Sequence, residues 1–581
     1  MKFISAQLSL IDKPTLILSL CIIAWVIMLS ISHHIFIKKQ KNLKVWRILC
    51  FIPFIVCIIH FSFYHLQGAF SITLQFYGML YITAFLIAIW QFFYQKKHLY
   101  RIFAVVIHLC ALVGMLLVLY LLGTNFIGMH NFSDQSYTES FLSTIQTMKE
   151  EYVLSDWKDI DYDALEAEIL PMVEKAEKEQ DEIAYGAALM TYCYRFHDGH
   201  IALEALDDDS HLELCRYLAG NDYGFSMITL DSGETIAILT EENCEANHAG
   251  IHDGTIITKW NGEPINTAKE NVECIYPEIL AFPVAENEEY LKAIFLAGKG
   301  TEENQVTFID GNGKEQTVTL KSIGDYMQRL NTALLCFYQK FDNTETNFNT
   351  YMLSEDCGYL KIIAESYKPL SDYNASITGE YPEIVSMLDQ KLEEMCQNGM
   401  SKLIIDLRNN TGGLDEVGSA VTSLFTKEKY FSHSLGVYKN GTYTALEHRF
   451  VPAYGKYSEL EVIALVNAEC CSSGDGIAEN LSKCPNVTLM GITTTNGINQ
   501  GVGGWCFTSN SRYVIGYPMF ASLNEDGLPR IDTRADRVSR IKLDEHIPLD
   551  AEAAKIIFDL DFENHKDYEL EYAVKYLENG S

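Results

Sequence analysis

Residues 403–413 read LIIDLRNNTGG, an apolar run that ends in a polar turn with two glycines. A short apolar run bounded by a turn is typical of a buried strand. Gly412 and Gly413 allow backbone N–H groups to point at one spot, which suits the binding of an oxyanion. Because many strand–helix junctions need glycine for packing alone, this stretch predicts a fold more firmly than it predicts a chemistry.

A second stretch of the same kind begins at Val462. The apolar residues 462–466 are followed by NAECCSSGD at 467–475 and then by a helical pattern. A serine at such a junction meets the positive end of the helix dipole and has the next backbone N–H as an oxyanion donor. The alternative is an ordinary helix N-cap, a position that favours Ser and Asp.

The surroundings of these stretches predict a layered α/β domain over residues 345–560. Further strands are expected at 358–363 and 487–491, and helical patterns occupy 380–398 and 416–426. Buried strands that alternate with helices indicate a parallel or mixed sheet. Residues 561–581 are expected to form an acidic C-terminal tail.

The region before this domain has two parts. Residues 132–205 show apolar positions at helical spacing and end in a turn-forming cluster, YRFHDGH at 194–200. Residues 222–325 change to short alternating strands. Within them, residues 246–262 resemble a PDZ domain through a small helix, a glycine turn, a strand and an Asn-Gly pair, although Thr255 replaces the usual Asp. PDZ domains bind extended peptides by adding a strand to a sheet edge; a generic small β domain is the alternative.

Residues 1–125 are expected to form a membrane domain. Four apolar runs, at about 15–32, 48–64, 69–94 and 102–122, approach the roughly 20 residues that a bilayer-spanning helix needs. Basic residues gather in the first and third loops between these runs, which predicts that everything after Leu122 lies outside the cytoplasm. The sequence therefore predicts a multi-pass protein of the cell membrane, with the lipid bilayer as a partner.

The charges and the cysteines exclude several classes of protein. The chain has a net charge of −33, and residues 126–581 hold 34 basic and 76 acidic residues, a net charge of −42. Such an acidic part repels phosphate backbones, so we expect no binding of nucleic acid. The fifteen cysteines include no CxxC pair, so neither a dense disulfide framework nor a structural zinc site is expected.

Three motifs occur in the order found in the carboxyl-terminal processing peptidases. These are GYLKI at 358–362, DLRNNTGG at 406–413 and VNAECCSSGD at 466–475. Over roughly residues 135–560 the chain resembles that family, also called tail-specific proteases, and its relative tricorn. The resemblance implies a ClpP- or crotonase-like protease core over 345–560 and a serine acyl-enzyme.

The same resemblance implies roles for individual residues. Ser472 falls at the nucleophile's position, and Ser473 is the main rival because the run of small residues permits a slip of one position. Cys471 is a third, weaker candidate, since a thiolate needs an activating partner. Backbone N–H groups of Ser473 and of Gly412 or Gly413 are expected to form the oxyanion hole.

The general base and its orienting acid differ from the commoner pattern of the family. Gly497 stands where many members have a catalytic lysine, so a Ser–Lys dyad is not expected. Tricorn-like members use a histidine from an upstream turn instead, which points to His200 of the Asp-Gly-His turn; a purely structural turn histidine is the alternative, and His197 fits the motif less well. Asp532 and Asp536 are the candidates for the orienting acid.

The predicted fold class is multidomain, with four transmembrane helices, a helical cap, a PDZ-like β domain and an α/β protease core. The predicted function is that of a membrane-anchored, extracytoplasmic serine endopeptidase that cleaves proteins near their C-terminal tails without metal or cofactor. The alternative is an inactive pseudopeptidase that serves as a membrane-tethered peptide-binding or sensor protein. The sequence leaves the substrate and the oligomeric state open.

Overall fold

The computed structural model describes residues 129–340, 346–365, 382–439, 441–532, 541–561 and 566–579. The chain divides into two units, Met1–Asn131 and Phe132–Ser581. In the first unit, the described residues form the strand β1 (Met129–Asn131). The second unit contains all the predicted site residues that the structure describes.

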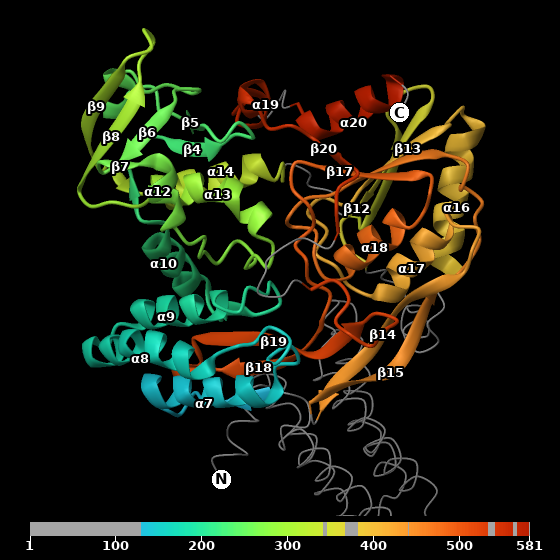
Figure 1. Cartoon of the computed structure of the whole chain (residues 1–581), viewed down its shortest axis with the longest axis horizontal. Coiled ribbons are helices and arrows are strands. Elements are labelled where there is room, and N and C mark those ends of the chain that lie inside the picture. The colour runs from blue at the N-terminus through green and yellow to red at the C-terminus, as the bar shows by residue number, and fades with distance from the viewer. Residues whose placement is uncertain are drawn as a thin grey trace, which may run out of the picture. The chain divides into compact units, whose positions relative to one another are not determined.

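A six-stranded sheet forms the centre of the region predicted to be α/β (Figure 1). Its strands, in spatial order, are β11 (Phe348–Met352), β12 (Cys357–Ile362), β13 (Lys402–Asp406), β16 (Glu461–Leu465), β17 (Val487–Gly491) and β20 (Glu545–His546). β11 pairs antiparallel to β12, and the other neighbours pair in parallel. The carboxyl ends of β13 and β16 therefore lie side by side, which brings the glycine turn next to the serine cluster.

Both faces of this sheet are covered, which explains its continuous apolar strands. Leu403 and Ile405 share one core with α16 (Pro382–Gln397), α17 (Asp415–Ser423) and α18 (Ser473–Ser482). Ile404 faces the opposite way and shares a core with α20 (Tyr568–Asn579). The alternation along β13 thus follows the two-residue period of a strand.

A second sheet joins this region to the N-terminal helices. It contains β18 (Gly501–Phe507), β19 (Tyr513–Leu523) and the long hairpin β14 (Tyr430–Lys439) and β15 (Thr442–Val451), and β2 (Ala202–Ala205) pairs with β19. Helices α7 (Tyr137–Glu151), α8 (Tyr162–Glu179) and α9 (Glu182–Tyr194) pack on it through one apolar core. The turn that carries His200 lies between α9 and β2, so this sheet fixes where that turn emerges.

The region from 221 to 337 is rich in short strands. Its elements are β3 (Asn221–Asp222), β4 (Ser226–Thr229), β5 (Thr235–Ile238), α11 (Glu245–Ala249), β6 (Ile257–Trp260), β7 (Glu263–Pro264), α12 (Ile265–Glu270), α13 (Ala285–Ala297), β8 (Glu303–Ile309), β9 (Glu315–Lys321), β10 (Gly324–Asp325) and α14 (Met327–Phe337). The small helix, the left-handed Gly250 and the strand that follows occupy the expected residues. The PDZ resemblance itself stays a prediction. Helix α10 (Asp208–Ala219) connects this region to the preceding helices.

One part of the predicted fold class needs correction. The four segments expected to be transmembrane helices, within residues 15–122, lie outside the described residues. In the part of the chain that the structure does describe, no helix combines the length and the apolar character needed to cross a bilayer. The architecture supported by the structure is the layered α/β core with its second sheet, its N-terminal helices and its β-rich region.

The C-terminal segment also differs from the expected acidic tail. After α19 (Ala551–Ile557), the helix α20 buries Ala573 and Leu577 in the core of the central sheet. The acidic residues obscured this helix in the sequence, although Glu569 is itself buried and Tyr568, Leu570, Tyr572, Val574 and Tyr576 also pack against the core.

Candidate active site

Ser472 occupies a strained position at the junction of β16 and α18. It is the N-cap of α18, with φ 60° and ψ −126°, and its side chain makes no capping hydrogen bond. A residue other than glycine in this region costs on the order of 1–3 kcal/mol, and such strain concentrates at functional sites. The hydroxyl is thus left free of the capping role that was the alternative explanation of the serine cluster.

The glycine turn after β13 packs directly against Ser472. Gly412 has φ +83°, and a Cβ built on it would lie 2.5 Å from the Ser472 Cβ and 3.0 Å from the Ser473 nitrogen. Only glycine fits there, because any side chain would collide with the serine turn. The two stretches singled out in the sequence therefore meet in one compact turn pair.

The structure distinguishes between the two candidate glycines of the oxyanion hole. The Gly412 N–H donates to Asn410 Oδ1 at 2.8 Å, so it is already occupied. The N–H groups of Gly413 and Ser473 have no acceptor in the described part of the chain. Gly413 and Ser473 are thus the better pair of candidate oxyanion donors. Gly412 instead allows the glycine turn to pack closely against Ser472.

The predicted base, His200, lies in a turn that is held on both sides. Tyr152 donates its hydroxyl hydrogen to Asp198 Oδ2 at 2.7 Å, and the His200 N–H donates to Asp198 Oδ1 at 2.9 Å. A Cβ on Gly199 would lie 2.9 Å from Ile498 Cδ1, and the Ile498 carbonyl accepts the Ser472 N–H at 3.0 Å. The segment around Ile498 therefore supports both the histidine turn and the serine turn.

The shift in the pKa of His200 favours a neutral imidazole, which can act as a base, over a permanently charged one. Burial lowers the pKa of His200, although the nearby carboxylates of Asp198 and Asp415 act in the opposite direction. Its buried Nδ1 has no hydrogen-bond partner among the described residues, and no hydrogen bond joins His200 to Ser472 there. At neutral pH the imidazole is neutral and able to accept a proton.

The two candidates for the orienting acid have different outcomes. Asp532 is completely buried, and its Oδ1 lies 3.2 Å from Lys158 Nζ, which also donates to the His197 carbonyl at 3.0 Å. Asp532 therefore approaches the histidine turn through Lys158. Asp536 lies outside the described residues.

The two rivals of Ser472 have environments that favour other roles. Ser473 donates its hydroxyl hydrogen to Glu365 Oε2 at 2.9 Å in the protein interior. Cys471 is buried, and burial raises its pKa well above the ordinary range, so a reactive thiolate is disfavoured. Of the three neighbours, Ser472 alone is half-exposed.

Two buried acids at the site escaped the sequence analysis. Burial raises the pKa of Glu365 to about 7, and this residue also accepts a hydrogen bond from Asn410 Nδ2 at 2.8 Å. Burial raises the pKa of Asp475 to about 7 as well, and its carboxyl accepts from the N–H groups of Gly497 at 3.2 Å and Ile498 at 3.0 Å. Asp475 had a sequence signal, its place in the first turn of a helix, but Glu365 had none.

A third acid, Asp415, begins α17 directly after the glycine turn. Burial alone would raise its pKa, but His433, Arg530 and Arg449 outweigh burial and hold the pKa well below the ordinary range. His433 Nε2 lies 3.2 Å from Asp415 Oδ2. Asp415 therefore adds a fixed negative charge to the surroundings of His200.

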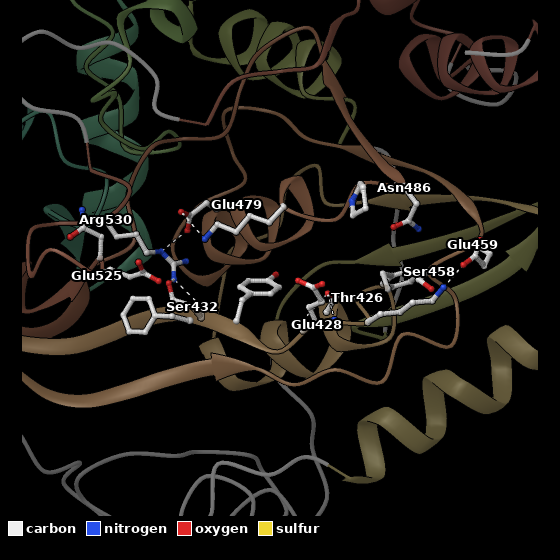
Figure 2. Close-up of a pocket in the computed structure, with 16 residues that line it drawn as sticks. Thr426, Glu428, Ser432, Ser458, Glu459, Glu479, Asn486, Glu525 and Arg530 are labelled. Carbon is white, nitrogen blue, oxygen red and sulfur yellow. Dashed lines mark hydrogen bonds and ion pairs between the residues drawn. The ribbon is translucent and has the colours of Figure 1, made fainter.

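Two cavities lie near the candidate site residues. A pocket of about 900 Å³ lies between the start of β14 and the C-terminal half of α18, and it does not include Ser472 or His200. In Figure 2, Arg530 reaches Glu479 and Ser432 at one end of this pocket. A smaller cavity of about 280 Å³ is lined by Gly199, Leu280 and Glu469. The smaller cavity borders the histidine turn at Gly199 and Ile201, but its lining does not include Ser472 or His200 either.

A hydroxyl on a strained strand–helix junction, two amides without an acceptor among the described residues and a histidine with a buried Nδ1 in a turn supported by the same segment are the kinds of group that a serine hydrolase uses. Residues 357–537 match the model of peptidase family S41. This match supports the assignment of the protein as a serine-type peptidase. Peptides or proteins are therefore its substrates.

Comparisons with solved structures show low similarity. Mature CPAF complexed with lactacystin has 12% identity and a TM-score of 0.48, with 77% of this chain and 99% of that chain covered. For the photosystem II D1 C-terminal processing protease, the sequence identity is 15% and the TM-score is 0.30, with 73% of this chain and 98% of that chain covered. For the tricorn protease, the sequence identity is 14% and the TM-score is 0.34, with 76% of this chain and 36% of that chain covered. The whole sequence finds no significant match among curated proteins.

Proposed function

We propose that the chain is an active endopeptidase with Ser472 as its nucleophile and His200 as its general base. The observation that carries this proposal is the strained Ser472 turn with Gly412 packed against it. Neither the strain nor the contact serves an ordinary helix cap. Both support a role for the Ser472 hydroxyl with the amides of Ser473 and Gly413 as the proposed oxyanion donors.

The proposed reaction is acyl transfer to water. His200 takes the proton from Ser472 Oγ, which attacks the carbonyl carbon of the scissile peptide. The N–H groups of Ser473 and Gly413 hold the oxyanion, and protonated His200 gives its proton to the leaving amine. Water then attacks the acyl-enzyme, again with His200 as the base.

The surrounding acids have positioning roles in this proposal. Asp475 holds the amides at 497 and 498, and so fixes the carbonyl that binds the Ser472 N–H. Glu365 and Asn410 fix the glycine turn. Asp532, acting through Lys158, is the proposed support of the histidine turn.

Labelling with a serine-reactive fluorophosphonate tests the nucleophile. We expect the full chain to become labelled and mass spectrometry to find the adduct on Ser472. Ser472→Ala should abolish labelling, while Ser473→Ala, the matched control one position away, should retain it. An adduct on Ser473 would transfer the role to that residue.

The base is tested by a second pair of variants. His200→Ala should lower kcat/KM for peptide hydrolysis at least about 10³-fold, because the serine is no longer deprotonated. His197→Ala serves as the control from the same turn and should keep most of the activity. Equal losses in both variants would point to damage of the turn instead of loss of a base.

We further propose that substrates are cleaved near their C-terminal tails and that the region 222–325 presents these tails as a PDZ-like domain. The support is the sequence resemblance of residues 246–262. Peptides with a free C-terminal carboxylate should be cleaved at least several-fold faster than the same peptides with a C-terminal amide. A protein that binds such tails but shows neither labelling nor hydrolysis would be an inactive peptide-binding or sensor protein.

The cellular location is also a proposal. The clusters of Lys and Arg at 38–47 and 96–101 support a peptidase part that works outside the cytoplasm. A protease added to intact cells should then digest an epitope tag placed after residue 579. Protection of the tag until the cells are lysed would refute the proposed location.

A further inference from the structure

Three side chains capable of binding a metal meet at α10, and none of them has a role in the proposed reaction. One of them, Glu278, also lines the smaller cavity beside the histidine turn. His211 and Cys215 lie one helical turn apart on the same face of this helix, and Glu278 reaches them from the segment between α12 and α13. The three donor atoms all lie within 4.8 Å of one another. No CxxC motif marks this set in the sequence, because the fold brings the three residues together from positions 211, 215 and 278.

The distance between the sulfur and nitrogen donors is close to that around a tetrahedral ion. The Cys215 Sγ lies 3.6 Å from His211 Nε2. Ideal zinc–sulfur and zinc–nitrogen bonds at a tetrahedral angle place these atoms about 3.6 Å apart. The sulfur and the nitrogen are thus already separated as a bound ion requires.

The carboxylate needs a small movement. Glu278 Oε1 lies 2.6 Å from His211 Nε2, a hydrogen bond that an ion would replace. Two ligands of these types on one zinc ion are about 3.4 Å apart. Because the Glu278 side chain is 49% exposed and lies in an irregular segment, it has room to withdraw by this amount.

The burial of the three donors leaves one side of the site open. Cys215 is buried, whereas the side chains of His211 and Glu278 are 39% and 49% exposed. The fourth position therefore faces solvent, where water completes the coordination. A set of one thiolate, one imidazole and one carboxylate favours zinc or a similar transition metal over magnesium or calcium.

We propose that His211, Cys215 and Glu278 bind one divalent transition-metal ion, with zinc as the best fit, and so tie the 271–284 segment to α10. The bond to sulfur forms as the Cys215 thiol releases its proton to solvent. The tied segment includes Leu280, whose Cβ lies 3.1 Å from the place a Cβ on Gly199 would take. Metal binding therefore stabilises the wall of the cavity beside the His200 turn.

Titration of the metal-free full chain with Co²⁺ tests the site directly. A thiolate–cobalt absorption band should appear, because the cobalt ion takes the sulfur ligand that zinc would take. Cys215→Ser should remove this band, and His211→Gln and Glu278→Gln should each weaken Co²⁺ binding at least tenfold. Cys396→Ser, which changes a half-buried cysteine of α16, is the matched control and should leave the titration unchanged.

The titration is read as the difference between the wild type and each variant, because the full chain has other histidines and cysteines. Thermal melting shows whether a variant folds, and the exposed His211 and Glu278 supply variants that keep the buried cysteine. No thiolate band in the wild type would overturn the proposal. Equal Co²⁺ affinity in the wild type, His211→Gln and Glu278→Gln would overturn it as well.

Discussion

Ser472 keeps its unusual backbone conformation because two loops contact it from opposite sides. The Gly412 contact lies on one side, and the Ile498 carbonyl, which accepts its N–H, lies on the other. The conformation is therefore over-determined by its surroundings, as stored backbone strain requires. Changes in either loop should affect the reaction without touching the hydroxyl.

Gly412→Ala is the sharpest test at this position. The new methyl group would lie 2.5 Å from the Ser472 Cβ, so the serine turn must move. Since small displacements of a nucleophile and its oxyanion donors are costly, kcat/KM should fall at least about 100-fold. Gly233→Ala is the matched control, because Gly233 has the same φ of +83° but nothing within 4 Å of an added Cβ. Similar losses in both variants would mean that backbone strain, and not contact with Ser472, is responsible.

Glu365 should make stability depend on pH. Its pKa is raised by burial from 4.5 in the unfolded chain to about 7 in the folded chain. The folded state therefore holds the proton more tightly, and the stability from this group is complete below pH 4.5 and is lost as pH rises to about 7. The loss is at most about 3 kcal/mol.

Glu365→Gln should remove this dependence while it keeps hydrogen bonds to Asn410 and Ser473. We expect the melting temperature of the wild type to fall, relative to that of the variant, between pH 4.5 and pH 7. Melting curves over this range measure the effect. A constant difference between the two proteins would show that Glu365 keeps its charge in the folded state.

The pH dependence of catalysis should report on His200. Burial lowers the pKa of His200 below its ordinary value of 6.5, and only the neutral imidazole accepts a proton. The acidic limb of kcat/KM should therefore fall below pH 6.5. The profiles of Glu365→Gln and Asp475→Asn separate this limb from effects of those two acids. An acidic limb above pH 6.5 in both variants would contradict the assignment.

The residues of the site differ in how well their roles could be predicted from the sequence. The serine and glycine turns were predictable because each follows an apolar strand and contains residues suited to a turn. The choice between Gly412 and Gly413 was not, since it depends on the Asn410 side chain. Glu365 carries no local signal, because its role arises from contacts with residues 45 and 108 positions away.

At the scale of elements, one buried ion cluster joins the end of β13 to the start of α20. Arg408 binds Asp406, Asp567 and Glu569, with separations from 2.7 to 3.1 Å. Burial alone would raise the pKa of Asp406, but Arg408 and Lys361 outweigh it and hold this pKa well below its usual range. Asp406 therefore stays ionised, whereas burial raises the pKa of Glu569. The cluster holds the C-terminal helix against the strand that leads into the glycine turn.

Arg408→Met should destabilise the α/β core strongly. Removing one partner of a buried ion cluster leaves carboxylates without compensation and costs about 3–5 kcal/mol. In scanning calorimetry of the full chain, this loss should lower the melting temperature of the core by roughly 6 °C or more. Lys427→Ala, which breaks the exposed Lys427–Glu459 pair, is the control and should leave the melting temperature nearly unchanged. Equal effects would place the contribution of Arg408 outside the cluster.

The elements themselves were predicted unevenly, for physical reasons. Strands β12, β13, β16 and β17 are buried on both faces, so their apolar runs stand out. The hairpin β14–β15 was not predicted, because most of β15 is exposed and its residues lack an apolar run. Helix α20 was taken for a tail because Glu569, a charged residue that signals exposure, is buried against Arg408.

At the scale of the whole molecule, charge should influence which substrates arrive quickly. Residues 126–581 carry a net charge of −42, and such a field speeds the approach of cations and slows that of anions. For a peptide rich in Lys and Arg, kcat/KM should fall several-fold between low and high salt, since salt screens this attraction. A neutral peptide with the same cleavage sequence is the control. Equal salt dependence for both peptides would mean that salt acts on the enzyme itself.

The order of the motifs along the chain also limits when the peptidase can first act. On the ribosome, the His200 turn emerges long before Ser472, and Glu569 emerges later still. Until that last segment docks, Arg408 keeps Asp406 as a partner but lacks Asp567 and Glu569. The support of the active site is therefore complete only after the C-terminal helix has been synthesised and has packed on Arg408.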